Sequence, residues 1–288
     1  MRFSALILAA LFVSAADAAP APEHRFAHIS VVSGGSGSPV VLIPGLSTPR
    51  SVWDDVAPEL ARNHRIILVQ INGFAGDDPG ANLKPGVISG AVDELHSYLA
   101  ANKLRPAKIV GHSLGGLAAL ELAKTHPEDA SALMIVDALP YVGDIFVPNA
   151  AVAQLEPQAK AMRDQMIASF GKSDSAIATR TASGMALTPA ARAKVASWIE
   201  MADSRVAGKA MYEDLTTDLR PDMAAIGTPI TLVFPYSKAM PKEKAEPFYH
   251  GEYAKAPKVT YVPIADSAHF VMLDQPQAFA AALAEFVK

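Results

Sequence analysis

The feature that most constrains the fold is a short apolar segment that turns through Gly-His-Ser-Leu-Gly into an alanine- and leucine-rich segment, at residues 107–119. Gly-x-Ser-x-Gly between a strand and a helix is typical of a nucleophile elbow, which exposes the serine hydroxyl on a strained backbone. Gly111 and Gly115 supply the two positions where a larger side chain would collide with the turn. The pattern predicts Ser113 as a nucleophile; a buried serine in a glycine turn is the structural alternative.

Composition narrows the class of protein. The chain has 288 residues, of which 50% are hydrophobic, and this suits one α/β domain with an insertion. The formal net charge is -4, so neither nucleic acid nor an anionic membrane is an implied partner. The absence of cysteine excludes disulfides and thiolate chemistry. The oligomeric state is left open by the sequence.

The N-terminus has the features of a secretion signal. Arg2 supplies a positive start, residues 5–13 form an apolar core, and residues 16–18 have the small-x-small pattern of a cleavage site. We expect residues 1–18 to be removed and the mature protein to be periplasmic or extracellular, in a bacterium. The apolar run is too short to span a bilayer stably. An uncleaved N-terminal anchor is the alternative.

Apolar runs alternate with helical periodicity along most of the chain. Expected strands lie at residues 26–32, 40–43, 65–71, 107–110, 132–136, 229–234 and 258–262, and expected helices at 51–63, 87–102, 114–126 and 276–287. Residues 141–226 are rich in alanine, methionine and charged residues and read as several inserted helices. The pattern predicts an α/β fold with a mostly parallel, doubly wound sheet. Its core would comprise residues 19–140 and 227–288.

Several polar residues follow predicted strands and should meet at one edge of the sheet. In doubly wound sheets the site lies beyond the carboxyl ends of the strands, where Ser113, Asp137, His269 and the turn at residues 44–46 all fall. A serine needs a base within hydrogen-bond reach, and His269 is the best candidate. His112 is adjacent to the serine, but its side chain should point away, so we interpret it as structural.

Three segments resemble the α/β-hydrolase superfamily. Residues 111–116 resemble its elbow, residues 42–46 its oxyanion strand and turn, and residues 267–270 its histidine loop. The resemblance covers nearly the whole chain after residue 18 and implies a helical cap over residues 141–226. Within the superfamily, the sequence most resembles the esterase and lipase-like group. A serine in the elbow argues against the haloalkane dehalogenase and epoxide hydrolase branches, which need an aspartate nucleophile.

The acid of the expected Ser-His-acid triad departs from the family pattern. The family usually carries it after the strand that follows the cap, where residues 233–238 contain no aspartate. Some members carry it at the end of the preceding strand, where Asp137 stands. A carboxylate there could accept a hydrogen bond from the imidazole Nδ1–H and fix its tautomer. We therefore favour Asp137; the alternatives are Glu243, Glu246, Asp144, Asp266 or no acid.

An oxyanion hole needs two backbone donors. The Leu114 N–H lies at the start of the helix after the elbow, and the Leu46 N–H lies in the turn after residue 43, with Ser47 as second choice. Both turns could instead be plain strand-to-helix connections. The sequence implies no metal and no organic cofactor.

The sequence thus predicts a secreted serine hydrolase acting on a small or medium carboxylic ester through an acyl-enzyme. The partner is a small-molecule ester. The same machinery serves thioesterases, amidases, peptidases, lactonases and C–C hydrolases, so these stay open. A hydrolase-fold binding protein without turnover is the alternative from another class.

Overall fold

The computed structural model describes residues 22–172 and 174–288, so the predicted secretion signal at residues 1–18 lies outside the described residues. Within them, one sheet has the strand order β1-β2-β4-β3-β5-β6-β7-β8. Its strands are β1 (Glu23–Arg25), β2 (Ile29–Gly34), β3 (Ser38–Ile43), β4 (His64–Ile71), β5 (Ala107–His112), β6 (Ala130–Val136), β7 (Ile230–Pro235) and β8 (Val259–Ile264). β2 is antiparallel to β1 and β4, and all other pairs are parallel. The predicted α/β class with a mostly parallel sheet is confirmed.

The central strands are continuous apolar runs because both faces of the sheet are buried. Successive side chains of β3 point to opposite faces. Val41 and Ile43 join the core on one face, and Val40 and Leu42 join the core on the other; all four are at most 3% exposed.

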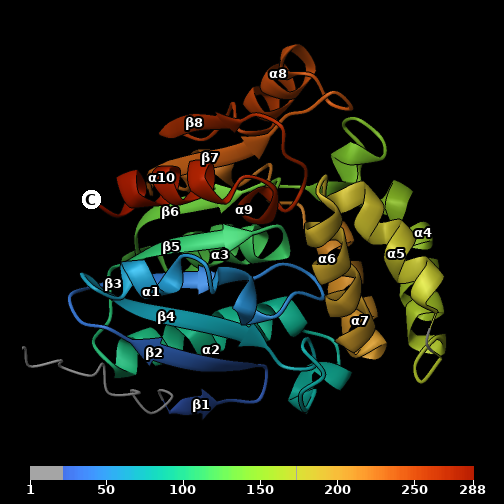
Figure 1. Ribbon diagram of the computed structural model, residues 1–288, viewed down its shortest axis with the longest axis horizontal. Helices are drawn as coiled ribbons and strands as arrows, with labels where there is room; N and C mark the ends of the chain where they lie inside the picture. The colour runs from blue at the N-terminus through green and yellow to red at the C-terminus, as the bar shows by residue number, and fades with distance from the viewer. Residues whose placement is uncertain (1–21, 173) are drawn as a thin grey trace, which may run out of the picture.

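Helices cover both faces (Figure 1). One face packs against α2 (Val87–Ala101), α3 (Leu114–Thr125) and α8 (Lys242–Glu252). The other packs against the 3₁₀ turn η1 (Arg50–Trp53), α1 (Ala57–Leu60), α9 (Val271–Asp274) and α10 (Pro276–Val287). Short 3₁₀ turns η2 (Gly80–Leu83) and η3 (Pro127–Asp129) occupy two connections.

A helical insert separates β6 from β7. It contains η4 (Val142–Ile145), α4 (Val152–Ala168), α5 (Ser175–Met185), α6 (Pro189–Met201), α7 (Ser204–Thr216) and η5 (Met223–Ala225). These four α-helices stand together beside the sheet in Figure 1. The insert is tied to the core by Glu213 on α7, whose carboxylate accepts the backbone N–H groups of Gly86, Val87 and Ile88 at 2.6, 3.0 and 2.8 Å. A carboxylate there also interacts favourably with the positive end of the α2 dipole.

Some elements differ from the sequence expectation. The predicted strand at residues 26–32 is shifted to β2, and the separate strand β1 precedes it. The predicted helix at residues 51–63 is broken into η1 and α1, because Pro58 lacks an N–H and suits only the first turn of a new helix. Helix α8 was not predicted; it contains Pro247 and Gly251, which weaken the helical signal. None of the described helices is both long and apolar enough to cross a membrane.

Candidate active site

Ser113 occupies a strained turn between β5 and α3. Its backbone has φ 53° and ψ -126°, a conformation that a non-glycine residue adopts only when its surroundings enforce it. A side chain at Gly111 would overlap the Gly115 carbonyl, and a Cβ at Gly115 would lie 2.5 Å from the Ile43 carbonyl oxygen. The two glycines therefore let β3 and the start of α3 close tightly around the serine.

Asp137 and His269 are in direct contact. Asp137 follows β6 with φ 44°, and its N–H donates to the Val233 carbonyl at 2.9 Å. His269 lies in the loop between β8 and α9, with Nδ1 2.7 Å from Asp137 Oδ2. In a neutral ring Nδ1–H then donates to the carboxylate, which leaves Nε2 free to accept a proton. The Tyr249 hydroxyl of α8 donates to the other carboxylate oxygen, Oδ1.

These donors keep the Asp137 carboxylate ionised. Burial alone would raise the pKa of Asp137, but the hydrogen bonds from His269 and Tyr249 and the nearby imidazole charge outweigh it, so the pKa lies below its ordinary value. The side chain of Asp137 is only 13% exposed, so its negative charge acts on His269 with little screening by water.

Ser113, Asp137 and His269 line one cavity of ≈ 150 Å³. Across the described residues, no hydrogen bond joins the serine hydroxyl to His269. Such contacts are often long in ligand-free proteins and tighten when substrate binds. Asp214 of α7 also reaches the cavity, and the remaining lining is formed by Leu117, Ala138, Leu139, Val142, Ile145, Phe248 and Tyr249.

The other candidate acids lie elsewhere. Glu243 is exposed and Glu246 half-buried on the first turns of α8, and Asp266 is an exposed residue with φ 49°. Asp144 is paired with Arg220 at 2.8 Å. Asp137 is thus the one of these carboxylates that contacts the imidazole.

The two residues predicted to supply oxyanion donors belong to two turns beside the serine. Leu114 is the first residue of α3, so its N–H has no acceptor within the helix. Leu46 follows Gly45, whose Cβ position would be 3.0 Å from Ser113 Cβ. Neither leucine is among the described residues that line the cavity, so their role stays a prediction.

His112 supports the loop that carries His269. Its ring is fully buried, and burial, reinforced by the nearby His269, lowers its pKa to about 3, so the ring is neutral. Nε2–H donates to the His269 carbonyl at 2.9 Å, and the two ring centroids are 4.6 Å apart. His112 thus has a structural role beside His269, as the sequence analysis expected.

Three residues at the site carry no signal in the sequence. Tyr249 and Asp214 lie within helices and reach the site only through the packing of α8 and α7. Asp274 accepts the N–H groups of Ala268, Leu187 and Thr188, at 3.0, 2.9 and 3.1 Å, and so joins the histidine loop to the insert.

A possible metal-ligand grouping lies far from the serine. In the described part of the chain, ligand atoms of His96, His126 and Glu128 lie within 4.8 Å of one another. The two imidazoles are stacked, with centroids 3.7 Å apart, so one ion could not lie in both ring planes. Arg105 also lies 3.6 Å from Glu128. The grouping sits at the opposite end of α3 from Ser113, and we assign no metal to it.

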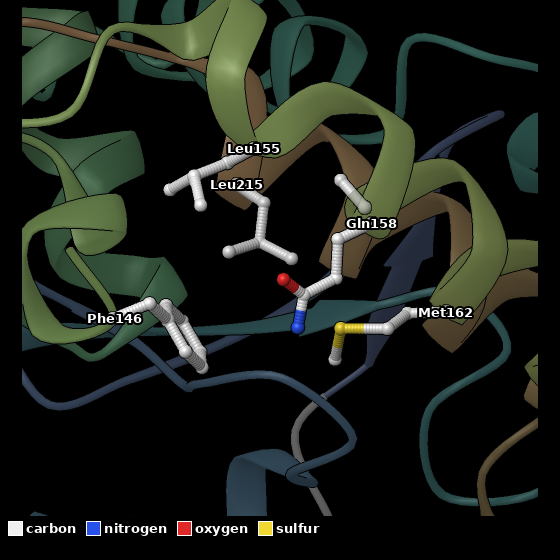
Figure 2. A pocket seen from close by; sticks show the side chains of 6 residues that line it. Phe146, Leu155, Gln158, Met162 and Leu215 are labelled. Carbon is white, nitrogen blue, oxygen red and sulfur yellow. The ribbon is translucent and has the colours of Figure 1, made fainter.

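A hollow larger than the cavity that Ser113 lines is also distant from the serine. It has ≈ 630 Å³ and is lined by the amino-terminal parts of β5 to β8, including Lys108, Thr231 and Lys258. In doubly wound sheets ligands bind at the carboxyl edge instead. A smaller crevice within the insert has ≈ 10 Å³, about the size of one water. Figure 2 shows Phe146 facing Leu155 and Leu215 across it.

A doubly wound sheet with a serine on a strained strand-to-helix turn, and an Asp–His pair at the same edge, is the arrangement of α/β proteins that use a serine nucleophile. The particular family follows from comparison. This chain belongs to the alpha/beta hydrolase family, whose model matches residues 40–282. The predicted resemblance is therefore confirmed.

Similarity to individual proteins is either confined to part of the chain or low in sequence identity. The chain is 35% identical over 112 residues to a pimeloyl-[acyl-carrier protein] methyl ester esterase of Aeromonas hydrophila, a match that covers 39% of this chain and 42% of the esterase. The fold of this chain is similar to that of an esterase from Thermogutta terrifontis, with TM-score 0.75 and 18% identity. The match covers 93% of this chain and 98% of that esterase. An enol-lactonase from Burkholderia xenovorans LB400 gives TM-score 0.72, 16% identity and coverage of 92% and 99%. The two structural likenesses show a shared fold.

Proposed function

We propose that this protein is an exported serine hydrolase that cleaves small carboxylic esters. The observation that carries the proposal is the 2.7 Å contact between Asp137 and His269 in the cavity that Ser113 lines. The partial similarity to a methyl ester esterase supports ester chemistry. Export rests on the N-terminal pattern of residues 1–18.

The proposed mechanism begins with a neutral imidazole. His269 Nε2 takes the proton from the Ser113 hydroxyl as the oxygen attacks the ester carbonyl, while Asp137 holds the ring and stabilises the imidazolium. The Leu114 and Leu46 N–H groups would bind the tetrahedral oxyanion. The alcohol leaves with the proton from His269, and water then hydrolyses the acyl-enzyme by the same steps.

The cavity favours a short substrate. An apolar cavity of about 150 Å³ accommodates a molecule of roughly the size of benzene. The cavity beside Ser113 has ≈ 150 Å³, and drug-sized ligands need considerably more. Acyl groups of about two to six carbons should therefore be preferred over long chains.

The test is a panel of p-nitrophenyl esters from acetate to dodecanoate, with a lactone, a thioester and an anilide of matched acyl group. Wild-type protein should hydrolyse the short esters and react with a fluorophosphonate probe, and Ser113→Ala should do neither while remaining folded by circular dichroism. Turnover that persists in Ser113→Ala would remove the mechanism. A folded wild-type protein that neither reacts with the probe nor turns over any substrate would favour the binding-protein alternative.

A further inference from the structure

Asp214 is a carboxylate inside the proposed catalytic cavity that the mechanism does not use. It lies on α7 of the insert and lines the same cavity as Ser113 and His269. Its pKa is raised to about 7 by burial, an effect that nearby His269 partly offsets. The neighbouring acidic residues of α7 and of the segments beside it have partners in the structure. Among the described residues, no hydrogen bond lowers the pKa of Asp214.

The contrast with its neighbours is clear along one short stretch of chain. Asp203 is paired with Arg205 at 2.6 Å, Glu213 caps α2, and Asp218 is paired with Arg220 at 2.7 Å. Each of these carboxylates holds a piece of the insert in place. Asp214 instead turns to the cavity, where a bound molecule could reach it.

The cavity offers no fixed positive partner. Among the described residues that line it, the titratable groups are Asp137, Asp214, Tyr249 and His269, and no lysine or arginine is present. Asp137 is already bound by His269 and Tyr249. The rest of the lining is mainly apolar, so the second carboxylate lacks a counter-ion in surroundings where a charge is costly.

The backbone at Asp214 is held in place by its two neighbours in the chain. Glu213, the preceding residue, is anchored to the start of α2, and Leu215, the following residue, packs toward α4 across the crevice in Figure 2. Because the backbone is already ordered, only the short side chain of Asp214 loses freedom when it meets a partner, and this favours binding.

We propose that Asp214 forms a cation subsite beside Ser113, so that the preferred substrates are small esters that carry an ammonium group in the acyl or the alcohol part. This inference rests on the proposed esterase function and names its substrate class. An ammonium group supplies the counter-ion that the cavity lacks, and the apolar lining receives its alkyl substituents. The carboxylates of Asp137 and Asp214 disfavour ester substrates that also carry a free carboxylate.

The test uses ester pairs in which a quaternary nitrogen replaces a carbon of the same shape. One pair is acetylcholine and 3,3-dimethylbutyl acetate; the other is the p-nitrophenyl esters of (trimethylammonio)acetate and 3,3-dimethylbutanoate. The measurement is the ratio of kcat/KM for the cationic ester over the neutral ester, at pH 8, where Asp214 is ionised. Comparison of this ratio between variants cancels the intrinsic reactivity of each ester.

In at least one pair, Asp214→Asn should lower the ratio by about tenfold or more, the size expected for one charge-assisted contact. The matched control is Asp164→Asn, which removes the same charge from an exposed position of α4 and should leave the ratio unchanged. Fluorophosphonate labelling of Asp214→Asn checks that Ser113 remains reactive. Ratios that agree within about twofold in both pairs would overturn the subsite.

Binding separates this inference from the esterase proposal. Tetramethylammonium chloride should bind wild-type protein more tightly than Asp214→Asn in calorimetry at pH 8, whether or not any ester is cleaved. Equal binding to both proteins would overturn the subsite. Hydrolysis of the neutral esters alone, without a cation preference, would leave the esterase proposal standing.

Discussion

Asp137 is held from two directions at once, by the imidazole of His269 and by the hydroxyl of Tyr249. The backbone beside it is also fixed, because the Tyr253 hydroxyl donates to the Ala138 carbonyl at 2.9 Å. The carboxylate is therefore rigid as well as ionised. In the proposed mechanism this rigidity sets the orientation of His269 toward the serine.

Asp137→Asn should lower kcat on the best short ester by about 10³- to 10⁴-fold with little change in KM, because an amide no longer fixes the tautomer or stabilises the imidazolium. Tyr249→Phe should have a smaller effect, since the contact with His269 remains. Steady-state kinetics on both variants checks this. Glu243→Gln and Glu246→Gln are the controls, each with less than about a tenfold loss. If Glu243→Gln or Glu246→Gln lowered kcat more than Asp137→Asn does, the acid of the triad would have to be assigned to α8.

Asp214 also affects how stability depends on pH. Its pKa rises from an ordinary 3.8 to about 7 on folding, so the folded protein binds this proton more tightly than the unfolded chain. The associated stability is fully present below about pH 4, declines as the pH rises, and is lost above about pH 7. Asp214→Asn lacks this dependence. Relative to wild type, its free energy of unfolding should therefore increase between pH 5.5 and 7.5, by about 2 kcal/mol at most.

Urea unfolding at several pH values measures that difference. The control Asp164→Asn, on the exposed side of α4, should show no comparable trend. A difference between Asp214→Asn and wild type that stays constant from pH 5.5 to 7.5 would show that Asp214 is solvated in the folded protein.

At the scale of elements, the elbow depends on backbones that approach one another closely. Gly111→Ala should destabilise the protein by about 3 kcal/mol or more, or abolish soluble expression, because the new methyl group would overlap the backbone of α3. Gly184→Ala is the matched control: it lies exposed in α5 with no neighbour within 4 Å of its Cβ position, and should stabilise by up to about 1 kcal/mol. Thermal unfolding of both variants provides the measurement. Equal stabilities would contradict the close approach.

The same elements show what the sequence could predict. Strands such as β3 and β5 were recognisable because burial on both faces requires uninterrupted apolar runs. Placement of Ser113, Asp137 and His269 at one edge followed from their positions after parallel strands. Short edge elements such as β1 were missed because exposed strands have no such requirement; its residues are all exposed.

The contacts that helices α7 and α8 make with the cavity could not be predicted from the sequence alone. Tyr249 and Asp214 reach the cavity from α8 and α7, whose positions over the sheet depend on the packing of the entire insert. Periodicity predicts which face of a helix is buried, but it does not say which group lies opposite. The sequence favoured Asp137 over Glu243 because Asp137 follows a strand, but the contact of its carboxylate with the imidazole is visible only in the fold.

Across the whole molecule, Asp274 joins two parts that are distant in sequence. Asp274→Ala should lower the free energy of unfolding by about 2 to 4 kcal/mol, because three partly buried N–H groups lose their acceptor. It should also reduce ester turnover, since the loop that carries His269 loses a support. Chemical denaturation and kinetics test both effects.

Asp222→Asn provides the control for Asp274. It breaks an exposed ion pair with Lys124 and should cost less than about 1 kcal/mol. If Asp274→Ala were as stable and active as this control, the insert and the histidine loop would be independent of one another.

The position of the insert in the chain affects how it could be exchanged during evolution. Both Ser113 and Asp137 precede it, His269 follows it, and the loop after β7 carries none of the three. Recombination between residues 140 and 226 could therefore exchange the insert as a cassette without dividing the proposed triad. A transplanted insert would have to keep its contacts with the core, among them those with the start of α2, the Asp274 carboxylate and the Gly73 carbonyl. Such an exchange could change the substrate preference while leaving the proposed reaction as it is.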